Sequence, residues 1–259
     1  MSKAPFWLLF SPVVPFLTQA SNLEVGAGIL YMSYPNYIGS AHQTQLFAPF
    51  PDINYHSQNT IINKDGIQRK LFNLDNLSID LSLGGSLPVN SQEDPLRQGM
   101  PDLDLALEIG PRLNYQLHQS TNQQFSLRLP LRMVLTTDLK GVDYQGYLIT
   151  PSLRYQYRLH NHKLTLITGP LWADHLYNNY FYGVRPNDAT PQRPSYDASS
   201  GYSGYQNSIT IEQQYHAWHG GIFLTHFNLH HTTFESSPLV VEHSALFAGT
   251  FLSYIFHAY

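Results

Sequence analysis

A strict alternation of apolar and polar residues runs through residues 102–136 and predicts two long β-strands joined by a short turn. In the first run every second residue is apolar, tyrosine or proline: Leu103, Leu105, Leu107, Ile109, Pro111, Leu113, Tyr115 and Leu117. After the polar turn at 118–122 the alternation resumes, with Phe125, Leu127, Leu129, Leu131, Met133 and Leu135 on one face. Because successive side chains of a strand point to opposite faces, each run has one apolar and one polar face.

The length of these runs separates two classes of β-protein. Strands of soluble domains usually contain about 5 to 6 residues, whereas a tilted strand that crosses a membrane needs about 9 to 11. Both runs exceed the longer figure. A soluble sandwich also alternates, but it rarely needs so many leucine-class residues in succession on one face. The hairpin therefore favours a transmembrane β-barrel.

Further strands follow the same period along the chain. They are expected at 23–34, 44–56, 59–63, 67–74, 77–87, 147–159, 163–172, 207–218, 221–230 and 245–256. Short turns and longer loops, such as 88–101 and the irregular, aromatic segment 174–205, separate them, as in bacterial barrels. No helical period stands out. We predict an all-β fold, a transmembrane antiparallel β-barrel of about twelve strands.

The first twenty residues form a separate unit. Lys3 precedes an apolar run from Phe6 to Leu17, and Thr18-Gln19-Ala20 offers a small-residue cleavage site. This order is typical of a secretory signal peptide, whereas three prolines oppose the alternative of a buried helix. We expect a signal peptide at 1–20 and an outer-membrane barrel at 21–259. No apolar run in the second segment approaches the ~20 residues of a membrane-spanning helix.

Composition narrows the function classes. Charged residues make up 12% of the chain and there are 18 tyrosines, which suits a barrel with aromatic girdles in contact with outer-membrane lipids. The net charge of -4 gives no basic patch, so nucleic-acid binding is not expected. With no cysteine in the sequence, a cysteine nucleophile and a thiolate metal site are excluded.

If the apolar faces meet lipid, the polar faces point into the lumen. The charged residues that these faces would bring there are Asp80, Asp104, Glu108, Arg112, Arg128, Arg132, Arg154 and Arg158. One interpretation is a plug of cross-paired side chains, because buried charges must pair. The other is an eyelet that selects small anions, since arginines outnumber acids in this set. A catalytic carboxylate pair, Asp104 with Glu108, lacks a third partner.

Metal and hydrolase chemistry receive little support from the pattern. The chain has 13 histidines, and His226 and His230 would share one face of a strand. Their Cβ atoms would then lie roughly 13 Å apart, too far to bind one ion, so no metal site and no cofactor is expected. The sequence also contains no Gly-x-Ser-x-Gly elbow of a serine hydrolase.

Several blocks of residues resemble the MipA/OmpV family, the MltA-interacting proteins of Gram-negative outer membranes. Their order and spacing cover nearly the whole chain after the signal peptide: Tyr34–Ser40, Asp75–Leu77 with Leu81–Gly84, Gly169–Asp174 with Tyr180–Val184 and Tyr196–Gly201, and Ser236–Val240 with Leu252–Phe256. Family members typically end at the final aromatic residue, whereas here His257-Ala258-Tyr259 follows Phe256.

The resemblance implies a non-enzymatic outer-membrane scaffold for cell-wall remodelling. It would hold a murein lytic transglycosylase near a murein synthase. Candidate partner-contacting residues in the matched loop blocks are Trp172, Asp174, Tyr180, Phe181, Tyr182, Tyr196 and Asp197. The alternative from the residues alone is a narrow outer-membrane channel or an adhesin, with an arginine-rich lumen and segment 174–205 over its mouth.

Overall fold

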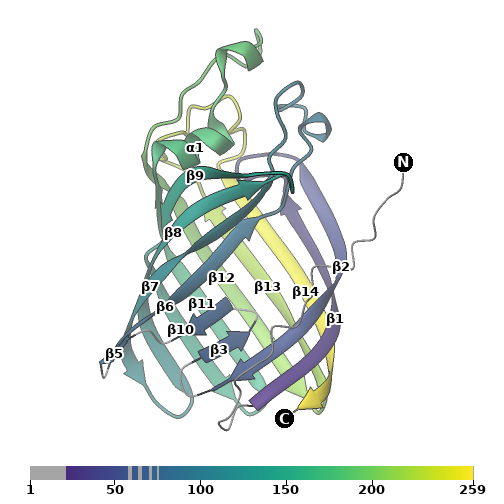
Figure 1. The fold of residues 1–259 in the computed structure, drawn as a ribbon, viewed down its shortest axis with the longest axis vertical. Coiled ribbons are helices and arrows are strands. Elements are labelled where there is room, and N and C mark those ends of the chain that lie inside the picture. The colour runs from purple at the N-terminus through teal and green to yellow at the C-terminus, as the bar shows by residue number, and fades with distance from the viewer. Residues whose placement is uncertain (1–21, 58–59, 64–65, 70–71, 75, 259) are drawn as a thin grey trace.

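A computed structural model describes residues 22–57, 60–63, 66–69, 72–74 and 76–258, and it forms an antiparallel β-barrel (Figure 1). The expected signal peptide at 1–20 lies outside the described residues. Within them, one sheet contains fourteen strands. The barrel predicted from the alternation is confirmed.

The strands follow one another around the wall in chain order. The first half contains β1 (Asn22–Pro35), β2 (Gln43–His56), β3 (Thr60–Asn63), β4 (Gly66–Arg69), β5 (Phe72–Leu74), β6 (Leu77–Ser86), β7 (Leu105–Gln119) and β8 (Gln123–Thr137). The second half contains β9 (Val142–Ile149), β10 (Ser152–Leu159), β11 (His162–Ala173), β12 (Gly201–Tyr215), β13 (Trp218–Asn228) and β14 (Ser244–Ala258).

The described part of the chain has fourteen strands where the sequence predicted about twelve, because two positions in the wall are each occupied by two short strands. Both β9 and β10 pair with β8 on one side and β11 on the other, and Pro151, which has no N–H to donate, lies between them. The short strands β4 and β5 lie between β3 and β6: β4 pairs with β3 and contacts β6, while β5 pairs with β6. The first and last strands pair over most of their length, from Glu24 opposite Ala258 to Ser33 opposite Ala248, which joins the two ends of the chain.

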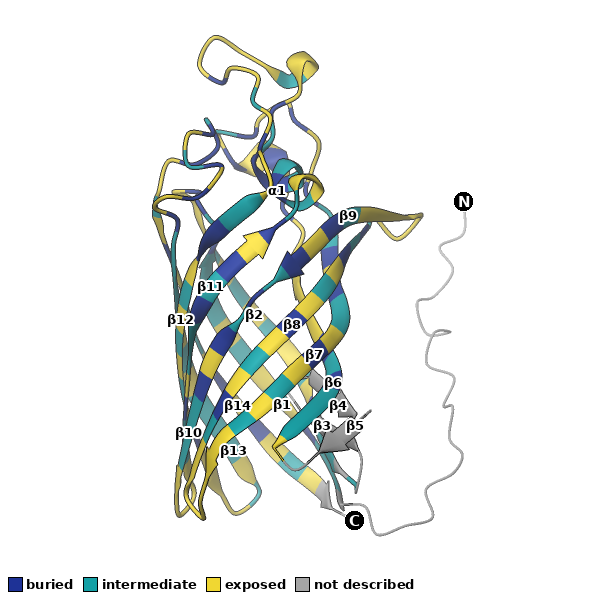
Figure 2. Cartoon of the chain, turned by 90° about the vertical axis from the view of Figure 1, so that its left-hand side faces the viewer, coloured by how far each residue is buried: buried dark blue, intermediate teal, exposed yellow. Residues whose placement is uncertain are grey.

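The alternation in sequence becomes an outer and an inner face. In β8, Leu131 and Met133 are 46% and 49% exposed, whereas Val134 and Thr136, which point inward, are almost completely buried. Figure 2 shows the same bands of exposed and buried residues along β7 and β8. The exposed leucines would meet lipid chains, since a membrane barrel turns its apolar face outward.

Exposed aromatic residues gather near both ends of the strands. One group, near the ends joined by long loops, contains Tyr31, Tyr144, Tyr147, Trp172 and Tyr205. The other group, near the short turns, contains Tyr215, Trp218, Tyr254 and Phe256, and the rings of Trp218 and Tyr254 pack edge to face at 5.1 Å. Amphipathic rings favour the two membrane–water interfaces, so these groups mark the depth at which the barrel sits in the bilayer.

The two ends of the barrel differ in their connections. Short turns follow β7, β10 and β12, whereas longer loops at 36–42, 87–104, 174–200 and 229–243 gather at the other end (Figure 1). In bacterial outer-membrane barrels the longer loops face the outside of the cell. We therefore call the end with the long loops the outer end and the end with the short turns the inner end.

Segment 174–205 is more ordered than the sequence suggested. It contains the helix α1 (His175–Tyr182), a short 3₁₀ turn η3 (Pro186–Asp188) and, from Gly201, the start of β12. The expectation of irregular structure throughout was wrong, because eight residues are too few to show a helical period and most of the helix is polar or aromatic. A second 3₁₀ turn, η2 (Ser91–Glu93), lies in loop 87–104. Among the described residues, no helix has the length and apolar character needed to cross a membrane.

The first testable consequence concerns Gly110, which faces the backbone of β8. A methyl group at this position would overlap the carbonyl group of Leu131. We expect G110A to lower the stability of the barrel by about 1–3 kcal/mol, the usual cost of overpacking. The measurement is the temperature at which the folded band of the purified barrel shifts its mobility in a detergent gel. Gly141, around which there is open space, provides the control G141A, and an equal loss in both variants would contradict the explanation.

Candidate functional site: the loop cap and the lumen beneath it

Loops 36–42, 87–104, 174–200 and 229–243 pack together over the outer end, and we call this unit the loop cap. Its core consists of buried apolar side chains from all of these loops, including Tyr37, Met100, Phe181, Phe234 and Leu239. Hydrogen bonds to backbone carbonyls join loops that are far apart in sequence, such as Tyr37 to Leu239 at 2.8 Å. The loop cap is therefore a small packed core of its own, and not a set of independent loops.

Helix α1 forms the lower part of the loop cap and is fixed at both ends. The side chain of Asp174 accepts a hydrogen bond from the backbone of Tyr177 at 3.0 Å, which satisfies a free N–H at the helix N-terminus. Asp174 in turn lies against Gly146 of β9, where the backbone has a φ of +93° and no side chain would fit. At the other end the ring of Tyr182 stacks on Phe234 at 3.7 Å, so α1 is attached to loop 229–243.

A buried polar cluster crosses the loop cap beside this core. The guanidinium of Arg97 donates to the carbonyl groups of Phe181 and Pro101 and lies over the ring of Tyr37, 5.7 Å from its centroid. The neighbouring carboxylate of Asp94 accepts from Ser40 at 2.7 Å. Burial raises the pKa of the Tyr37 hydroxyl, so it stays protonated and remains a donor.

Beneath α1 lies a cavity of about 450 Å³ inside the barrel. One wall is aromatic and contains Tyr34, Phe223, Phe227 and Phe247, whereas the opposite wall carries the Glu108–Arg132 ion pair. The roof consists of the α1 rings Tyr177, Phe181 and Tyr182. Burial and the nearby Glu108 carboxylate raise the pKa of Tyr177 well above its ordinary value. The cavity therefore combines an apolar wall, a charged wall and a neutral hydroxyl group.

Below and beside the cavity, charged side chains of neighbouring strands pair with one another on the inner face of the wall. Arg112 binds Asp80 through two hydrogen bonds of 2.8 and 2.9 Å, and Asn114 donates to the same carboxylate. Arg132 contacts Glu108 at 2.8 Å and Ser82 at 2.9 Å. These pairs hold β6, β7 and β8 together from the inside. The Arg112–Asp80 contact is bidentate, which is the stronger kind of ion pair.

A second network lies nearer the inner end, between β2, β12, β13 and β14. The two ring nitrogens of His219 face carboxylates, Asp52 at 2.8 Å and Glu212 at 3.5 Å. Lys163 reaches Glu212 at 3.0 Å. Ser253 donates its hydroxyl hydrogen to Asp52 and not to the imidazole. The hydroxyl group therefore lacks the general base that a Ser-His-Asp hydrolase requires, although all three residue types are present.

The structure separates the charged residues that the sequence assigned to the lumen. Asp80, Glu108, Arg112 and Arg132 form the ion pairs described above. Arg154 is buried and Arg128 half-buried, and both interact with neighbouring residues. Asp104 precedes β7 at the outer end, where its backbone N–H donates to Tyr180, and Arg158 is exposed beside the inner turn at 160–161. These last two lie at the ends of the wall and not in the paired set.

The candidate partner-contacting residues all lie in or beside the loop cap. Phe181 and Tyr182 are buried in its core, and Asp174 caps α1, so these side chains support the fold locally. The hydroxyl oxygen of Tyr180 accepts a hydrogen bond from the backbone N–H of Asp104 in loop 87–104, and Tyr196 packs against the core. Trp172 belongs to the outer aromatic group, and Asp197 pairs with His175 at the surface. Buried members of this set offer no surface to another protein.

Sequence reasoning missed the second network and the apolar part of the lumen. Asp52, His219, Glu212 and Lys163 lie on strands whose two faces are poorly sorted in sequence, so their common location could not be inferred. The inner faces of β7, β8, β9 and β11 become apolar below α1, with Ala106, Val134, Leu148 and Leu171 forming a small core. Three consecutive apolar residues, Met133, Val134 and Leu135, make both faces of the strand apolar at this point, and this run could have indicated the change.

A second testable consequence concerns the buried Asp80–Arg112 pair. Removing one partner leaves a buried charge, so R112M should cost about 3 kcal/mol or more of unfolding free energy in detergent. Adding Asp80→Asn should recover part of this loss, because the uncompensated carboxylate is removed. The exposed pair Lys140–Asp138, 3.8 Å apart, provides the control, since K140M should change stability by less than about 1 kcal/mol. Equal effects of R112M and K140M would refute the interpretation.

Comparisons with known proteins place this architecture in a family. The sequence matches the family described as MltA-interacting protein MipA over residues 25–256. Comparison with curated proteins returned no match. Solved structures with a similar course of the chain include an outer-membrane channel from Pseudomonas putida F1, with a TM-score of 0.44 and 10% identity over 95% of this chain and 100% of that chain.

Two further structures are similar at a comparable level. The NanC porin has a TM-score of 0.40 and 7% identity over 90% of this chain and 98% of that chain. OmpT, an outer membrane protein of Vibrio cholerae, has a TM-score of 0.39 and 6% identity over 93% and 99%. Similarities this low carry no argument about function. The family match, in contrast, extends from the first strand to the last, and the chain belongs to the MltA-interacting protein MipA family.

Proposed function

We propose that this barrel is a non-enzymatic scaffold in the outer membrane that holds a murein lytic transglycosylase near a murein synthase. The observation that carries the proposal is the packed loop cap, which covers the outer end of the barrel. Below it, the Asp80–Arg112 and Glu108–Arg132 pairs join neighbouring strands on the inner face of the wall. A barrel whose outer end is covered can bind other proteins through its exposed surface. The name of the family, which refers to interaction with MltA, supports the same function.

The position of murein decides which surface would bind these enzymes. Murein lies on the inner side of the outer membrane, so its enzymes would meet the inner end of the barrel. The turns at 120–122, 160–161 and 216–217 are exposed there and contain only polar, uncharged or histidine residues apart from Ala217. We assign partner contact to these turns. The loop-cap residues favoured by the sequence lie at the opposite end.

The hydrogen bonds of a Ser–His–Asp group in the wall support the non-enzymatic part of the proposal. Among the described residues, the Ser253, Asp52 and His219 arrangement comes nearest to a triad, but its serine donates to the carboxylate. Its histidine is held between two carboxylates, which favours a positioning role in the barrel wall. Both features suit a structural network.

The alternative function, a narrow channel, is favoured by one observation. The 450 Å³ cavity beneath α1 has room for a small molecule with one apolar and one charged side. A channel would need the loop cap to open. A scaffold needs no such conformational change, and we therefore favour it.

A third testable consequence follows from the assigned contact surface. A photo-crosslinking amino acid at Asn161, in an inner turn, should capture a purified murein lytic transglycosylase when the barrel is held in detergent micelles. The same amino acid at Asn187, exposed in the loop cap, should not, because this position lies at the opposite end of the barrel from the proposed contact surface. The measurement is the mass of the crosslinked product in a denaturing gel. Capture from Asn187 alone would contradict the assignment.

A fourth prediction separates the scaffold from the channel. In planar lipid bilayers the purified barrel should give no discrete conductance steps, because the packed loop cap covers the outer end of the lumen. The matched variant Y182A/F234A removes the stacked rings that attach α1 to loop 229–243, and it should conduct more than the unaltered chain. Discrete openings of the unaltered chain that disappear when Arg128 and Arg132 are replaced would favour the channel.

A further inference from the structure

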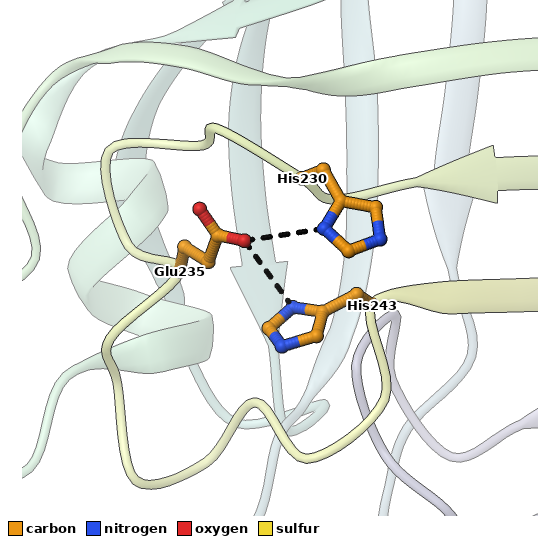
Figure 3. A group of neighbouring side chains, drawn as sticks. All are labelled: His230, Glu235 and His243. Atoms are coloured by element: carbon orange, nitrogen blue, oxygen red, sulfur yellow. Dashed lines mark hydrogen bonds and ion pairs between the residues drawn. The ribbon is translucent and has the colours of Figure 1, made fainter.

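Loop 229–243 brings two histidines and a glutamate together at the outer surface, as Figure 3 shows. Nδ1 of His230 lies 3.3 Å from Oε1 of Glu235, and Nδ1 of His243 lies 3.8 Å from the same oxygen. Each of the three residues has a ligand atom within 4.8 Å of those of the other two. We propose that His230, Glu235 and His243 bind a divalent transition-metal ion, and that Zn²⁺ fits their chemistry best.

The donor set selects the class of ion. Imidazole nitrogens bind Zn²⁺, Cu²⁺ and Ni²⁺, whereas Mg²⁺ and Ca²⁺ prefer sites built from oxygen alone. Two imidazoles and one carboxylate are also a combination that binds zinc with a fourth position left to water. The side chains of His230, Glu235 and His243 are 56%, 35% and 38% exposed. An ion could therefore enter from solvent and keep a water molecule in its open position.

The distances require only a small movement on binding. Zinc–nitrogen and zinc–oxygen bonds of about 2.1 Å in a tetrahedron place neighbouring ligand atoms roughly 3.4 Å apart. The separation between His230 and Glu235 is already 3.3 Å, and that between His243 and Glu235 is 3.8 Å. Rotation of the His243 ring by a small angle would complete the geometry. The centroids of the two imidazole rings lie 5.0 Å apart, with 28° between the ring planes, and Nδ1 of each ring is directed at Oε1 of Glu235.

The backbone around these residues holds the ligands in place. Leu229 and Phe234 precede His230 and Glu235 and are completely or almost completely buried in the loop cap. A hydrogen bond of 2.9 Å from the backbone N–H of Leu229 to the carbonyl of His243 joins the two ends of the loop. The backbone N–H of His231 donates to Oε2 of Glu235 at 2.9 Å, which leaves Oε1 directed at the histidines. Ligands fixed in this way lose little conformational freedom when they bind an ion.

Within the described part of the chain, one nitrogen atom of the group lacks a hydrogen-bond partner. Nδ1 of His243 is shielded from solvent and has no hydrogen-bond partner among the described residues. Buried polar atoms nearly always have a partner, so such an exception requires an explanation. Coordination of a metal ion by this nitrogen would provide the missing interaction.

The sequence pattern did not indicate this site because it placed His230 on a strand with His226. The structure ends β13 at Asn228, so His230 lies in the loop and turns toward Glu235. His226 instead contacts Ser244. The proposal replaces the expectation that the chain has no metal site, and it is independent of whether the barrel acts as a scaffold.

The test is isothermal titration calorimetry, in which Zn²⁺ is added to the purified, untagged full-length barrel in detergent. We expect one equivalent to bind, and H243Q and E235Q each to weaken binding by about tenfold or more, since loss of even supporting residues has effects of this size. Mg²⁺ should not compete. Glutamine is close in size to glutamate and histidine and keeps a polar side chain, so both variants should keep the temperature of the gel-mobility shift unchanged without metal, which confirms that they fold.

The matched control is H175Q. His175 also forms an exposed pair with a carboxylate at the outer end, 2.9 Å from Asp197, but it lacks a third ligand. This variant should bind Zn²⁺ as tightly as the unaltered chain. The proposal is overturned if no zinc binds, if H243Q and E235Q bind it unchanged, if H175Q weakens binding as much as they do, or if Mg²⁺ displaces zinc at equal concentration.

Discussion

A peptide group in the hydrocarbon of a bilayer finds no water to bond with, and each unsatisfied N–H or carbonyl costs several kcal/mol. The ladder between β1 and β14 answers this constraint, because it joins the first and last strands and leaves no open edge along them. Closure then fixes which side of every strand meets lipid. The exposed leucines of β7 and β8 and the inward charges of the same strands are two results of one geometry.

Closure also explains why the interior is organised in layers. A wall of about twelve strands encloses a wider lumen than the eight-strand interior that side chains just fill, and it leaves the cavity beneath α1. Where inward residues are charged, as at Asp80 and Arg112, they must find partners across neighbouring strands. Where they are apolar, as at Val134 and Leu171, they need a hydrophobic surface above them, and α1 provides it. The lumen is thus polar in its middle and apolar beneath the loop cap.

The sequence allowed the barrel to be predicted because the period of two is repeated in every long strand and depends on local geometry alone. The cross-strand partners Asp80 and Arg112 were in the predicted lumen set for the same reason. The loop cap could not be predicted, since contacts such as that between Tyr37 and Leu239 join residues 202 positions apart and follow no period. The grouping of His230, Glu235 and His243 depends on where β13 ends, a boundary that alternation leaves uncertain by two residues.

The attachment of the loop cap to both ends of the chain has a consequence for assembly. Tyr37 follows the first strand, whereas Phe234, Leu239 and Val240 precede the last, and these residues share one buried core. This core can be completed only after β14 has docked beside β1. Burial of Tyr37 therefore reports that the wall has closed, and an incompletely inserted chain would carry exposed aromatic side chains on its outer face. Such a chain would differ from the finished barrel at a site that proteases and antibodies outside the membrane can reach.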